Sequence, residues 1–270
     1  MLTSQRKKLI LDKLAAEGQV QSRALSEWFN VSEDTIRRDL RELSAEGRLQ
    51  RVHGGALPAS AAVVDYAGRS QLSLDSKRAV ARRAAALIAP GQIVMLDGGT
   101  TTGELVKCLP PDLAITVITH SPGIALQLVE HPRIEVILIG GRLFKHSIVS
   151  VGAAAIEAMS HLRADLFFLG VTGVHADAGL STGDYEEACV KRALASRAAE
   201  TVVMASREKL NAASAFCIGD MSLVNTLIVE GDTADTLLTP FEARGVTVIK
   251  ASPPENSRYK NQAMPASVKG

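Results

Sequence analysis

Apolar side chains recur at helical spacing in three successive segments at the start of the chain. The segments cover residues 4–17, 22–30 and 32–47. Their apolar positions are Leu9, Ile10 and Leu14 in the first segment, Leu25, Trp28 and Phe29 in the second, and Ile36, Leu40 and Leu43 in the third. Within each segment these positions fall on one face, as in helices that share a core. We therefore predict three packed helices, with Ser22 as the N-cap of the second and Trp28 in the core rather than stacked on a ligand.

The third segment also carries an ordered pattern of charge. Ser32 is a favourable N-cap, the negative charges of Glu33 and Asp34 suit the first helical turn, and Gly47 ends the helix. At about 100° per residue, the face opposite the apolar one carries Asp34, Arg38, Arg41 and Ala45, with Arg37 at its flank. Taken alone, such a face suits a solvated surface as well as it suits DNA.

After this helix the pattern changes from helical to alternating. Polar and apolar residues alternate from Arg48 to His53, which indicates a half-buried strand, and Gly54 and Gly55 then turn the chain. About three residues separate the second and third helices, so the two form a helix-turn-helix, and the hairpin makes it the winged variant. In this arrangement the third helix enters the major groove and the wing meets the flanking phosphates.

Residues 31–57, VSEDTIRRDLRELSAEGRLQRVHGGAL, closely resemble the DNA-binding motif of the DeoR family of bacterial transcriptional regulators. The TIRRDL core, the Leu-x-x-x-Gly spacing and the RVHGGA wing all match that family. The resemblance implies sequence-specific binding to double-stranded operator DNA. We expect Thr35 and Arg38 to reach bases, and Arg37, Arg41, Arg51 and the backbone of Gly54 to contact phosphates. The expected DNA-binding residues are Ser32, Thr35, Arg37, Arg38, Arg41, Arg51, His53 and Gly54.

The remaining chain divides by composition into three regions. Residues 58–74 are rich in Ala and Ser without a sustained period, which predicts a linker after a head of residues 1–57. Across residues 75–250, wholly apolar strands alternate with helices, which is typical of a mostly parallel sheet covered on both faces. The polar stretch 251–270 predicts a disordered tail. The predicted fold is a small α-helical winged helix-turn-helix domain plus an α/β sensor domain with a mostly parallel sheet.

Turns rich in Gly and Thr follow several predicted strands, at the edge of the sheet where open α/β sheets bind ligands. They are residues 97–102, 119–121, 140–142 and 170–173. In the first, DGGTTT, two glycines allow backbone N–H groups to approach an anion, three hydroxyls can donate, and a helix begins next. This turn is either a phosphate cradle or a strand-to-helix turn that needs small residues, and the residues alone favour neither.

The resemblance to the DeoR family continues from about residue 75 to 230, through a sensor domain similar to ribose-5-phosphate isomerase and the coenzyme A transferase fold. It implies that these turns hold the phosphate of a phosphorylated sugar. Two residues depart from the family. His120, which can titrate near neutral pH, replaces the usual Asn. Ser206 replaces a common Asp while Lys209 remains, and because a carboxylate is lost we expect altered sugar selectivity. The implied effector-binding residues are Asp97, Gly98, Gly99, Thr100, Thr101, Thr102, Thr119, His120, Ser121, Gly141, Arg142, Lys191 and Lys209.

The isomerase similarity raises an alternative function, a sugar-phosphate isomerase-like enzyme with an accessory DNA-binding head. Such enzymes carry an Asp-Gly-Ala-Asp-Glu run after the strand that resembles ADLFFLG, whereas residues 170–174 here read GVTGV and offer no carboxylate to move a proton. Glu187 and Lys191, one helical turn apart, suit a surface ion pair as well as a ligand contact. We therefore predict a regulator and not an enzyme, specifically a repressor of carbohydrate-metabolism genes controlled by a phosphorylated sugar.

Composition changes this prediction little. The formal net charge is +1, and residues 1–57 hold ten Lys or Arg against eight Asp or Glu, so charge alone does not indicate nucleic acid. Three scattered cysteines and six histidines show no metal-binding spacing, so we expect reduced thiols, no metal and no cofactor. Without a signal peptide or membrane span, we expect a cytoplasmic, nucleoid-associated protein. One head offers an interface of roughly 600–1,000 Å², so we expect a homodimer or homotetramer.

Overall fold

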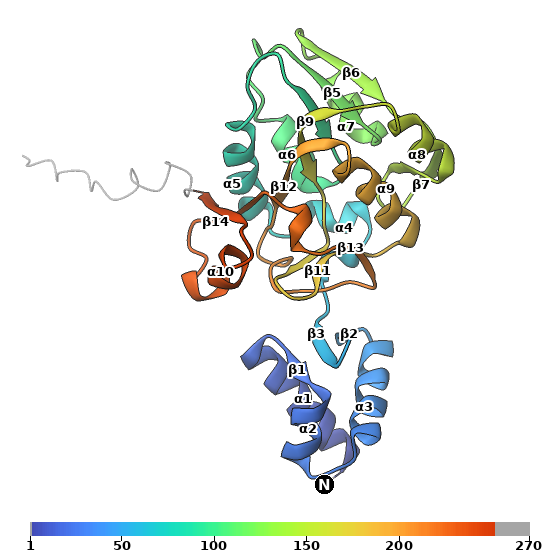
Figure 1. Cartoon of the computed structure of the whole chain (residues 1–270), viewed down its shortest axis with the longest axis vertical. Helices are drawn as coiled ribbons and strands as arrows, with labels where there is room; N and C mark the ends of the chain where they lie inside the picture. Colours follow the sequence, from blue (N-terminus) through green and yellow to red (C-terminus); the bar gives the residue numbers. More distant parts are fainter. Residues whose placement is uncertain (1, 252–270) are drawn as a thin grey trace, which may run out of the picture.

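Figure 1 shows the computed structural model of the protein, which describes residues 2–251 as a small head followed by a larger α/β domain. The predicted fold class is confirmed: a winged helix-turn-helix precedes a domain built on a seven-stranded parallel sheet. Ala251 ends the last strand of that sheet. The tail predicted after it lies outside the described residues.

The head consists of three helices and a three-stranded sheet. The helices are α1 (Thr3–Glu17), α2 (Ser22–Phe29) and α3 (Glu33–Ala45), and the strands, in sheet order, are β1 (Val20–Gln21), β3 (Gly55–Pro58) and β2 (Leu49–Val52). The apolar positions that pack together in its core include Ile10, Leu14, Leu25, Ile36, Leu40 and Leu43. Ser32 caps α3 as predicted, because its hydroxyl accepts a hydrogen bond from the Thr35 amide at 3.3 Å. The two-residue β1 is too short to show alternation, so the sequence did not predict it.

Two expectations for α2 are wrong. Ser22 is the first residue of the helix, and the N-cap is Gln21, whose side chain makes no capping bond. Trp28 is 53% exposed and lies outside the core. Its ring lies 4.4 Å from that of Phe29, and the Lys13 ammonium lies 5.1 Å from its centroid. The core of this small head closes over Leu25 and the partly buried Phe29, which leaves the indole at the surface.

A buried ion pair joins α1 to α3. The Arg6 guanidinium donates to both carboxylate oxygens of Asp39, one of them at 3.0 Å, and both side chains are buried. The hydrogen bond to Asp39 raises the pKa of Arg6 above its ordinary value. This pair was not predicted, because an Arg and an Asp on amphipathic helices usually lie in solvent.

The α/β domain is organised by a single parallel sheet. Its strands, in spatial order, are β15 (Thr247–Ala251), β14 (Thr226–Glu230), β12 (Ala198–Met204), β9 (Ala164–Leu169), β4 (Ile93–Leu96), β5 (Ile115–Thr119) and β6 (Ile134–Leu138). Successive residues of a strand point to opposite faces. Thus Val94 and Leu96 of β4 belong to one apolar cluster, while Met95 between them belongs to the other.

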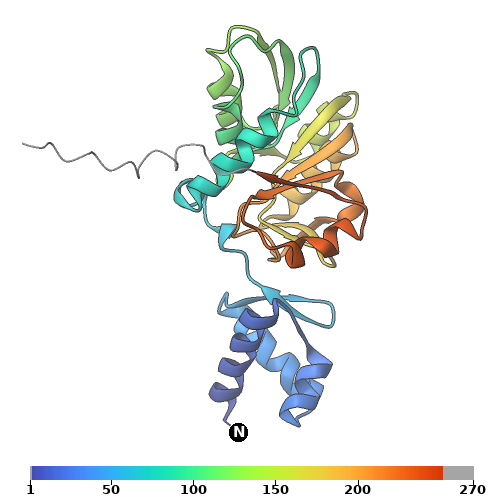
Figure 2. The ribbon, with the colours of Figure 1, turned by 90° about the vertical axis from the view of Figure 1, so that its left-hand side faces the viewer.

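Helices cover both faces of the sheet, as the apolar strands require. One face packs against α5 (Leu74–Ala85), α6 (Thr100–Val106) and α7 (Pro122–Leu128). The other packs against α8 (Ala153–Met159), α9 (Tyr185–Ala195) and α10 (Asp235–Glu242). Figure 2 shows the sheet nearly edge-on, with helices on either side. No helix among the described residues is long and apolar enough to cross a membrane.

Two small antiparallel sheets flank the main one and were not predicted from the sequence. The first contains β10 (Gly173–His175), β11 (Gly179–Thr182) and β13 (Phe216–Gly219), with the 3-10 helix η2 (Met221–Leu223) after it. The second pairs β7 (Arg142–Phe144) with β8 (Val149–Val151). Strands of three or four residues, most of them buried throughout, show no alternation from which to recognise them.

Residues 59–73, which join the head to α5, are more ordered than a linker. They contain the 3-10 helix η1 (Ala61–Val63) and the helix α4 (Tyr66–Gln71), capped by the Asp65 carboxylate. Six residues are too few to display a helical period, so the sequence suggested an irregular segment. We call residues 59–73 the strap; it runs from the head along the α/β domain (Figure 2).

Candidate nucleic-acid interface and anion pocket

The exposed face of α3 carries three arginines in two different states. Arg37 is already paired with Glu33 at 2.9 Å and with Asp34 at 3.2 Å. Arg38 and Arg41 are exposed and make no ion pair with any residue in the described range 2–251. Arg38 and Arg41 are therefore the guanidinium groups of this helix that are free to meet a nucleic acid.

The other predicted contact residues lie at the start of α3 and on the wing. The hydroxyls of Ser32 and Thr35 lie 3.0 Å apart and bond to each other, so Ser32 is engaged in capping the helix. Arg51, His53 and Gly54 are exposed on the hairpin, where Gly54 takes a φ of +77°. A groove of about 350 Å³ lies between the wing and α3 and is lined by Arg37, Arg51, His53 and Gly54, among others.

The carboxyl ends of β4 and β9 lie side by side in the sheet and bring two of the predicted turns together. Between them lies a cavity of about 40 Å³. Its lining consists of Gly98, Gly99, Thr100, Thr101, Thr102, Gly170, Val171 and Thr172 from these turns, with Arg69, Ser147, Thr182, Glu187, Lys191 and Lys209 from elsewhere. We call this cavity the anion pocket.

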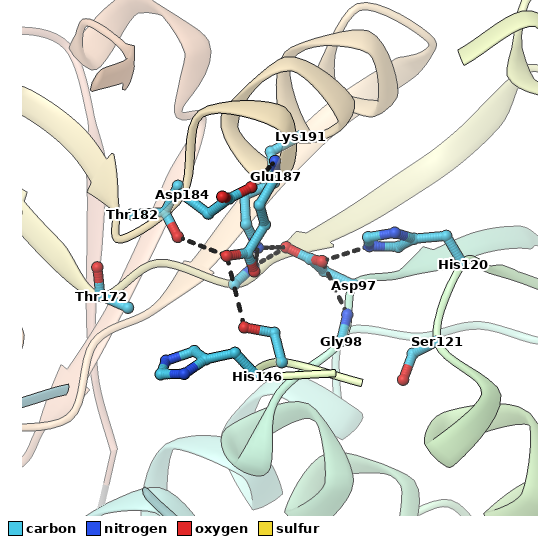
Figure 3. Close-up of polar contacts among 12 residues, drawn as sticks. Asp97, Gly98, His120, Ser121, His146, Thr172, Thr182, Asp184, Glu187 and Lys191 are labelled. Carbon is cyan, nitrogen blue, oxygen red and sulfur yellow. Dashed lines mark hydrogen bonds and ion pairs between the residues drawn. The ribbon is translucent and has the colours of Figure 1, made fainter. Parts of the chain in front are cut away.

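Asp97 lies behind the lining and is fully buried. One carboxylate oxygen accepts from the Gly98 amide at 2.8 Å and from His120 at 2.7 Å, and the other accepts from the Gly170 amide at 2.8 Å and from Lys191 at 2.6 Å (Figure 3). Burial opposes ionisation, but the Lys191 and His120 charges and hydrogen bonds outweigh it and lower the pKa of Asp97 to about 2. With four donors already bound, Asp97 fixes the two turns and has little capacity left for a ligand.

His120 supports Asp97 from the side away from the cavity. Its second ring nitrogen lies 2.8 Å from the carbonyl oxygen of Ser150. Both ring nitrogens thus face oxygen atoms, one of Asp97 and one of the backbone. The Asn-to-His departure from the family pattern therefore places an additional donor on Asp97, not on the cavity wall.

Glu187 and Lys191 do pair, at 3.3 Å, but both side chains are buried, so a surface ion pair is the wrong description. Glu187 also accepts from the Thr182 hydroxyl at 2.9 Å. Burial works against the charge on Lys191, yet Asp97 and Glu187 together raise its pKa above the ordinary value. Lys191 is thus a fixed cation with two carboxylate partners.

Two other cations at the cavity have no carboxylate partner within salt-bridge distance among the described residues. Arg69 donates to the Val64 carbonyl at 2.7 Å and to the Ser147 hydroxyl at 3.2 Å, and burial lowers its pKa. Lys209 donates to the Thr101 hydroxyl at 2.9 Å, and burial lowers its pKa to about 8. Buried charges are normally paired. Two that are not, side by side on one cavity, favour an anionic ligand.

Several predicted effector residues do not line the cavity. The Thr119 hydroxyl accepts from the Ser121 amide at 3.1 Å, and Ser121 caps α7. Gly141 lies against β8, and Arg142 is exposed and paired with Glu186. Strand β5 lies directly beside β4, and β6 follows at the edge of the sheet. The 119–121 turn therefore lies next to the pocket, with His120 bound to Asp97 and Ser121 close to Gly98, although neither turn contributes to the lining.

Of the lining residues that the sequence did not reveal, which include Ser147 and Thr182, the cationic one is Arg69. It lies in the strap, outside the range where ligand-binding turns were sought, and a single Arg in an Ala- and Ser-rich stretch has no motif around it. Ser206, which replaces the family's Asp, is buried and donates to Glu208 at 2.7 Å rather than lining the cavity. Within residues 2–251, no group of three or more His, Cys, Asp or Glu side chains could hold a metal ion.

A winged helix-turn-helix joined to a domain with a buried cationic cavity defines a two-part regulator, with a DNA-binding head and a ligand-sensing body. Two family models match the chain in the corresponding places. The DeoR-like helix-turn-helix domain matches residues 6–61, and the DeoR C terminal sensor domain matches residues 73–231. The chain belongs to the DeoR family of transcriptional regulators.

Similar proteins carry the same combination over nearly their whole length. The HTH-type transcriptional regulator GlpR of Haloferax volcanii is 34% identical, across 92% of this chain and 98% of its own. The putative aga operon transcriptional repressor of Escherichia coli O157:H7 is 33% identical, across 92% and 93%. The glycerol-3-phosphate regulon repressor of Escherichia coli K12 is 29% identical, across 85% and 92%.

Membership in this family confirms that the chain is a DNA-binding regulator and not an enzyme. Among solved structures, ribose 5 phosphate isomerase A from Neisseria gonorrhoeae is 15% identical with a TM-score of 0.38, over 52% of this chain and 53% of that one. A similarity of that size supports no statement about activity.

Proposed function

We propose that this protein represses carbohydrate-metabolism genes and that a phosphorylated sugar in the anion pocket controls its hold on operator DNA. The observation that carries the proposal is the pair of buried cations, Arg69 and Lys209, which lack a carboxylate partner in the described structure. A phosphate ester brings close to two negative charges and three acceptor oxygens at neutral pH. It would satisfy both cations at once and could also accept from the backbone amide of Gly99.

The size of the cavity bears on how such a ligand acts. A volume of about 40 Å³ holds roughly one water-sized group, which is less than a phosphorylated sugar needs. We propose that binding favours an arrangement in which the walls stand further apart. A ligand that prefers one arrangement shifts the population towards it, which is the physical requirement for a sensor.

The names of the relatives are consistent with this ligand class. One is a glycerol-3-phosphate regulon repressor and another a putative aga operon transcriptional repressor. We carry over from them the class of small phosphorylated polyols and sugars, without choosing one compound.

On the DNA side, we propose that Arg38 and Thr35 of α3 reach bases and that Arg41, Arg51 and the wing contact phosphates. A head of this size supports useful affinity only when at least two act together. A surface suited to pairing is the outer edge of the sheet, where edge strand β6 and helix α7 expose Leu126, Val129 and Leu138. We therefore propose a homodimer or homotetramer that works in the cytoplasm on the nucleoid.

One experiment tests both halves. Genomic fragments that the purified protein retains are titrated at fixed salt in the presence of a panel of phosphorylated sugars and the matching free sugars. We expect at least one phosphorylated sugar to change DNA affinity by about 5- to 150-fold, equivalent to a coupling of about 1–3 kcal/mol. Equal effects of free and phosphorylated sugars would contradict the anion pocket, and failure to retain any fragment would contradict the operator role.

A further inference from the structure

The strap begins as a continuation of the wing. Strand β3 of the wing ends at Pro58, whose carbonyl accepts from the Ala213 amide of the α/β domain at 3.1 Å. Two residues further on, the Ser60 amide donates to the Ala213 carbonyl at 3.1 Å, and Ala59 forms a bridge with the same residue. The last residue of the wing is thus hydrogen-bonded directly to the α/β domain.

Ser60 then reaches the wall of the anion pocket. Its hydroxyl donates to the backbone carbonyl of Thr172, a residue of the lining. The Thr172 hydroxyl in turn lies 2.7 Å from that of Ser214, next to Ala213. A displacement of the Gly170–Thr172 wall would therefore act on Ser60, two residues from the wing.

The far end of the strap is attached to another part of the lining, at Ser147. Arg69 bonds to the Ser147 hydroxyl, and the Tyr66 amide donates to the His146 carbonyl at 3.0 Å. In addition, the Nε2 atom of His146 lies 3.0 Å from the carbonyl oxygen of Val63. Figure 3 shows Thr172 to the left of the Asp97 cluster and His146 below it. The strap is thus attached to two separate parts of the pocket lining, at Thr172 and at Ser147.

We infer that Arg69 is an anion-binding residue, and that the strap converts its engagement with the ligand into a displacement of the wing through the Ser60–Thr172 contact. This inference rests on the proposed anion pocket and adds the route by which its occupancy is read by the head.

The partners of Arg69 explain why an anion would move the strap. Its guanidinium now bonds only to neutral oxygens, from Val64, Ser147 and His146. Charge-assisted bonds to a phosphate are shorter and about twice as strong, so an anion competes successfully for the same donors. Lys77, which is buried and donates to the Arg69 carbonyl at 2.5 Å, ties this part of the strap to α5. Because Lys77 holds Arg69 near the end of α4, we expect the residues that precede α4, 59–65, to be the part of the strap that moves.

The test uses the full-length protein with inorganic phosphate as the probe, and measures both affinity and amide hydrogen exchange in peptides covering residues 49–60. In the wild type, phosphate should bind and change exchange in these peptides. Arg69→Gln should weaken binding by about 10- to 100-fold, the range for loss of charged hydrogen bonds. Arg82→Gln removes an exposed charge of α5 outside the pocket and serves as the matched control, with unchanged affinity and an unchanged exchange response.

Ser60→Ala separates binding from transmission. It should bind phosphate as the wild type does, yet lose the exchange response in residues 49–60, which a merely structural role for Ser60 would not produce. A response of wild-type size in Ser60→Ala, or wild-type affinity in Arg69→Gln, overturns the inference. If Arg69→Gln does not fold, Arg69→Lys keeps a cation but loses the planar fork, and wild-type affinity there overturns the inference equally. No phosphate binding to the wild type overturns instead the proposed pocket itself.

Discussion

The outer face of α3 and the anion pocket are both rich in charge, but they hold it under opposite conditions. On α3, Arg38 and Arg41 lie in water, where a charge costs little and an ion pair with a neighbour contributes about 0–1 kcal/mol. In the pocket, Asp97 and Lys191 are buried, where an unpaired charge costs several kcal/mol. The difference indicates that charges of α3 can be exchanged for DNA phosphates without disturbing the fold, whereas those of the pocket are part of the fold.

The largest effect we expect comes from removing the central carboxylate of the pocket. Asp97→Ala leaves Lys191 and His120 buried with one partner fewer each, which should cost about 3–5 kcal/mol of unfolding free energy. Thermal unfolding of the full-length protein measures this as a fall in Tm. The matched control is Asp34→Ala on the exposed face of α3, which should stay within about 0.5 kcal/mol of the wild type. Similar small losses for both variants would contradict the contrast between the two regions.

The next effect lies on the DNA side. Arg38→Ala should leave Tm unchanged and weaken binding to a retained genomic fragment by about 1–3 kcal/mol, with relaxed preference at one base position. Arg37→Ala is the neighbouring control, because that guanidinium is already paired with Glu33 and Asp34. Arg37→Ala should therefore weaken DNA binding less than Arg38→Ala does. If Arg37→Ala proved the more damaging of the two in titrations at equal salt, the pairing on α3 would not decide which arginine meets DNA.

The smallest expected effect is the pH dependence of phosphate binding, which arises from the buried Lys209 in the pocket and not from the exposed arginines of α3. Its pKa is about 8 in the folded protein, well below the ordinary 10.5, because it is buried. Lys209 is therefore charged below about pH 8 and becomes neutral above it, so phosphate affinity should fall about tenfold by about pH 9. Without ligand the sign for stability is opposite: between the two pKa values the unfolded chain binds the extra proton, so stability rises with pH.

Calorimetric titration with inorganic phosphate between about pH 7 and 9.5 measures the first of these changes. Lys209→Arg serves as the control, because a guanidinium stays charged over this range. An affinity that does not change across the range in the wild type would mean that Lys209 does not contact the anion.

The same contrast explains what the sequence could and could not predict. The face of α3 could be predicted because residues four apart in sequence are neighbours on a helix, which identifies its buried positions. Its N-cap and its end followed from the residue types at those positions. The alternation of strands and helices likewise predicted the parallel sheet. Turns 97–102 and 170–173 were correctly placed together, because they follow strands that are adjacent in the sheet.

The rest of the pocket depends on contacts between distant segments. Arg69, Asp97, Lys191 and Lys209 come from four separate elements, and no spacing rule links them. The turns at Ser121 and Arg142 looked equivalent to the others in sequence, but Ser121 caps α7 and Arg142 pairs with Glu186, and neither lines the cavity. The exposed Trp28 was misjudged for a related reason, since its burial depends on how much room the other two helices leave.

Strand β3 makes backbone hydrogen bonds both within the wing and to the α/β domain. Pro58 is paired with Leu49 inside the wing, while its carbonyl is bonded to Ala213 in the α/β domain. A head held in this way has a fixed position and orientation relative to the α/β domain. If copies of the chain associate through their α/β domains, the distance and rotation between their heads are set by protein geometry. Operators whose half-sites were moved by half a turn of DNA, about 5 base pairs, would then present one of them on the wrong side of the helix.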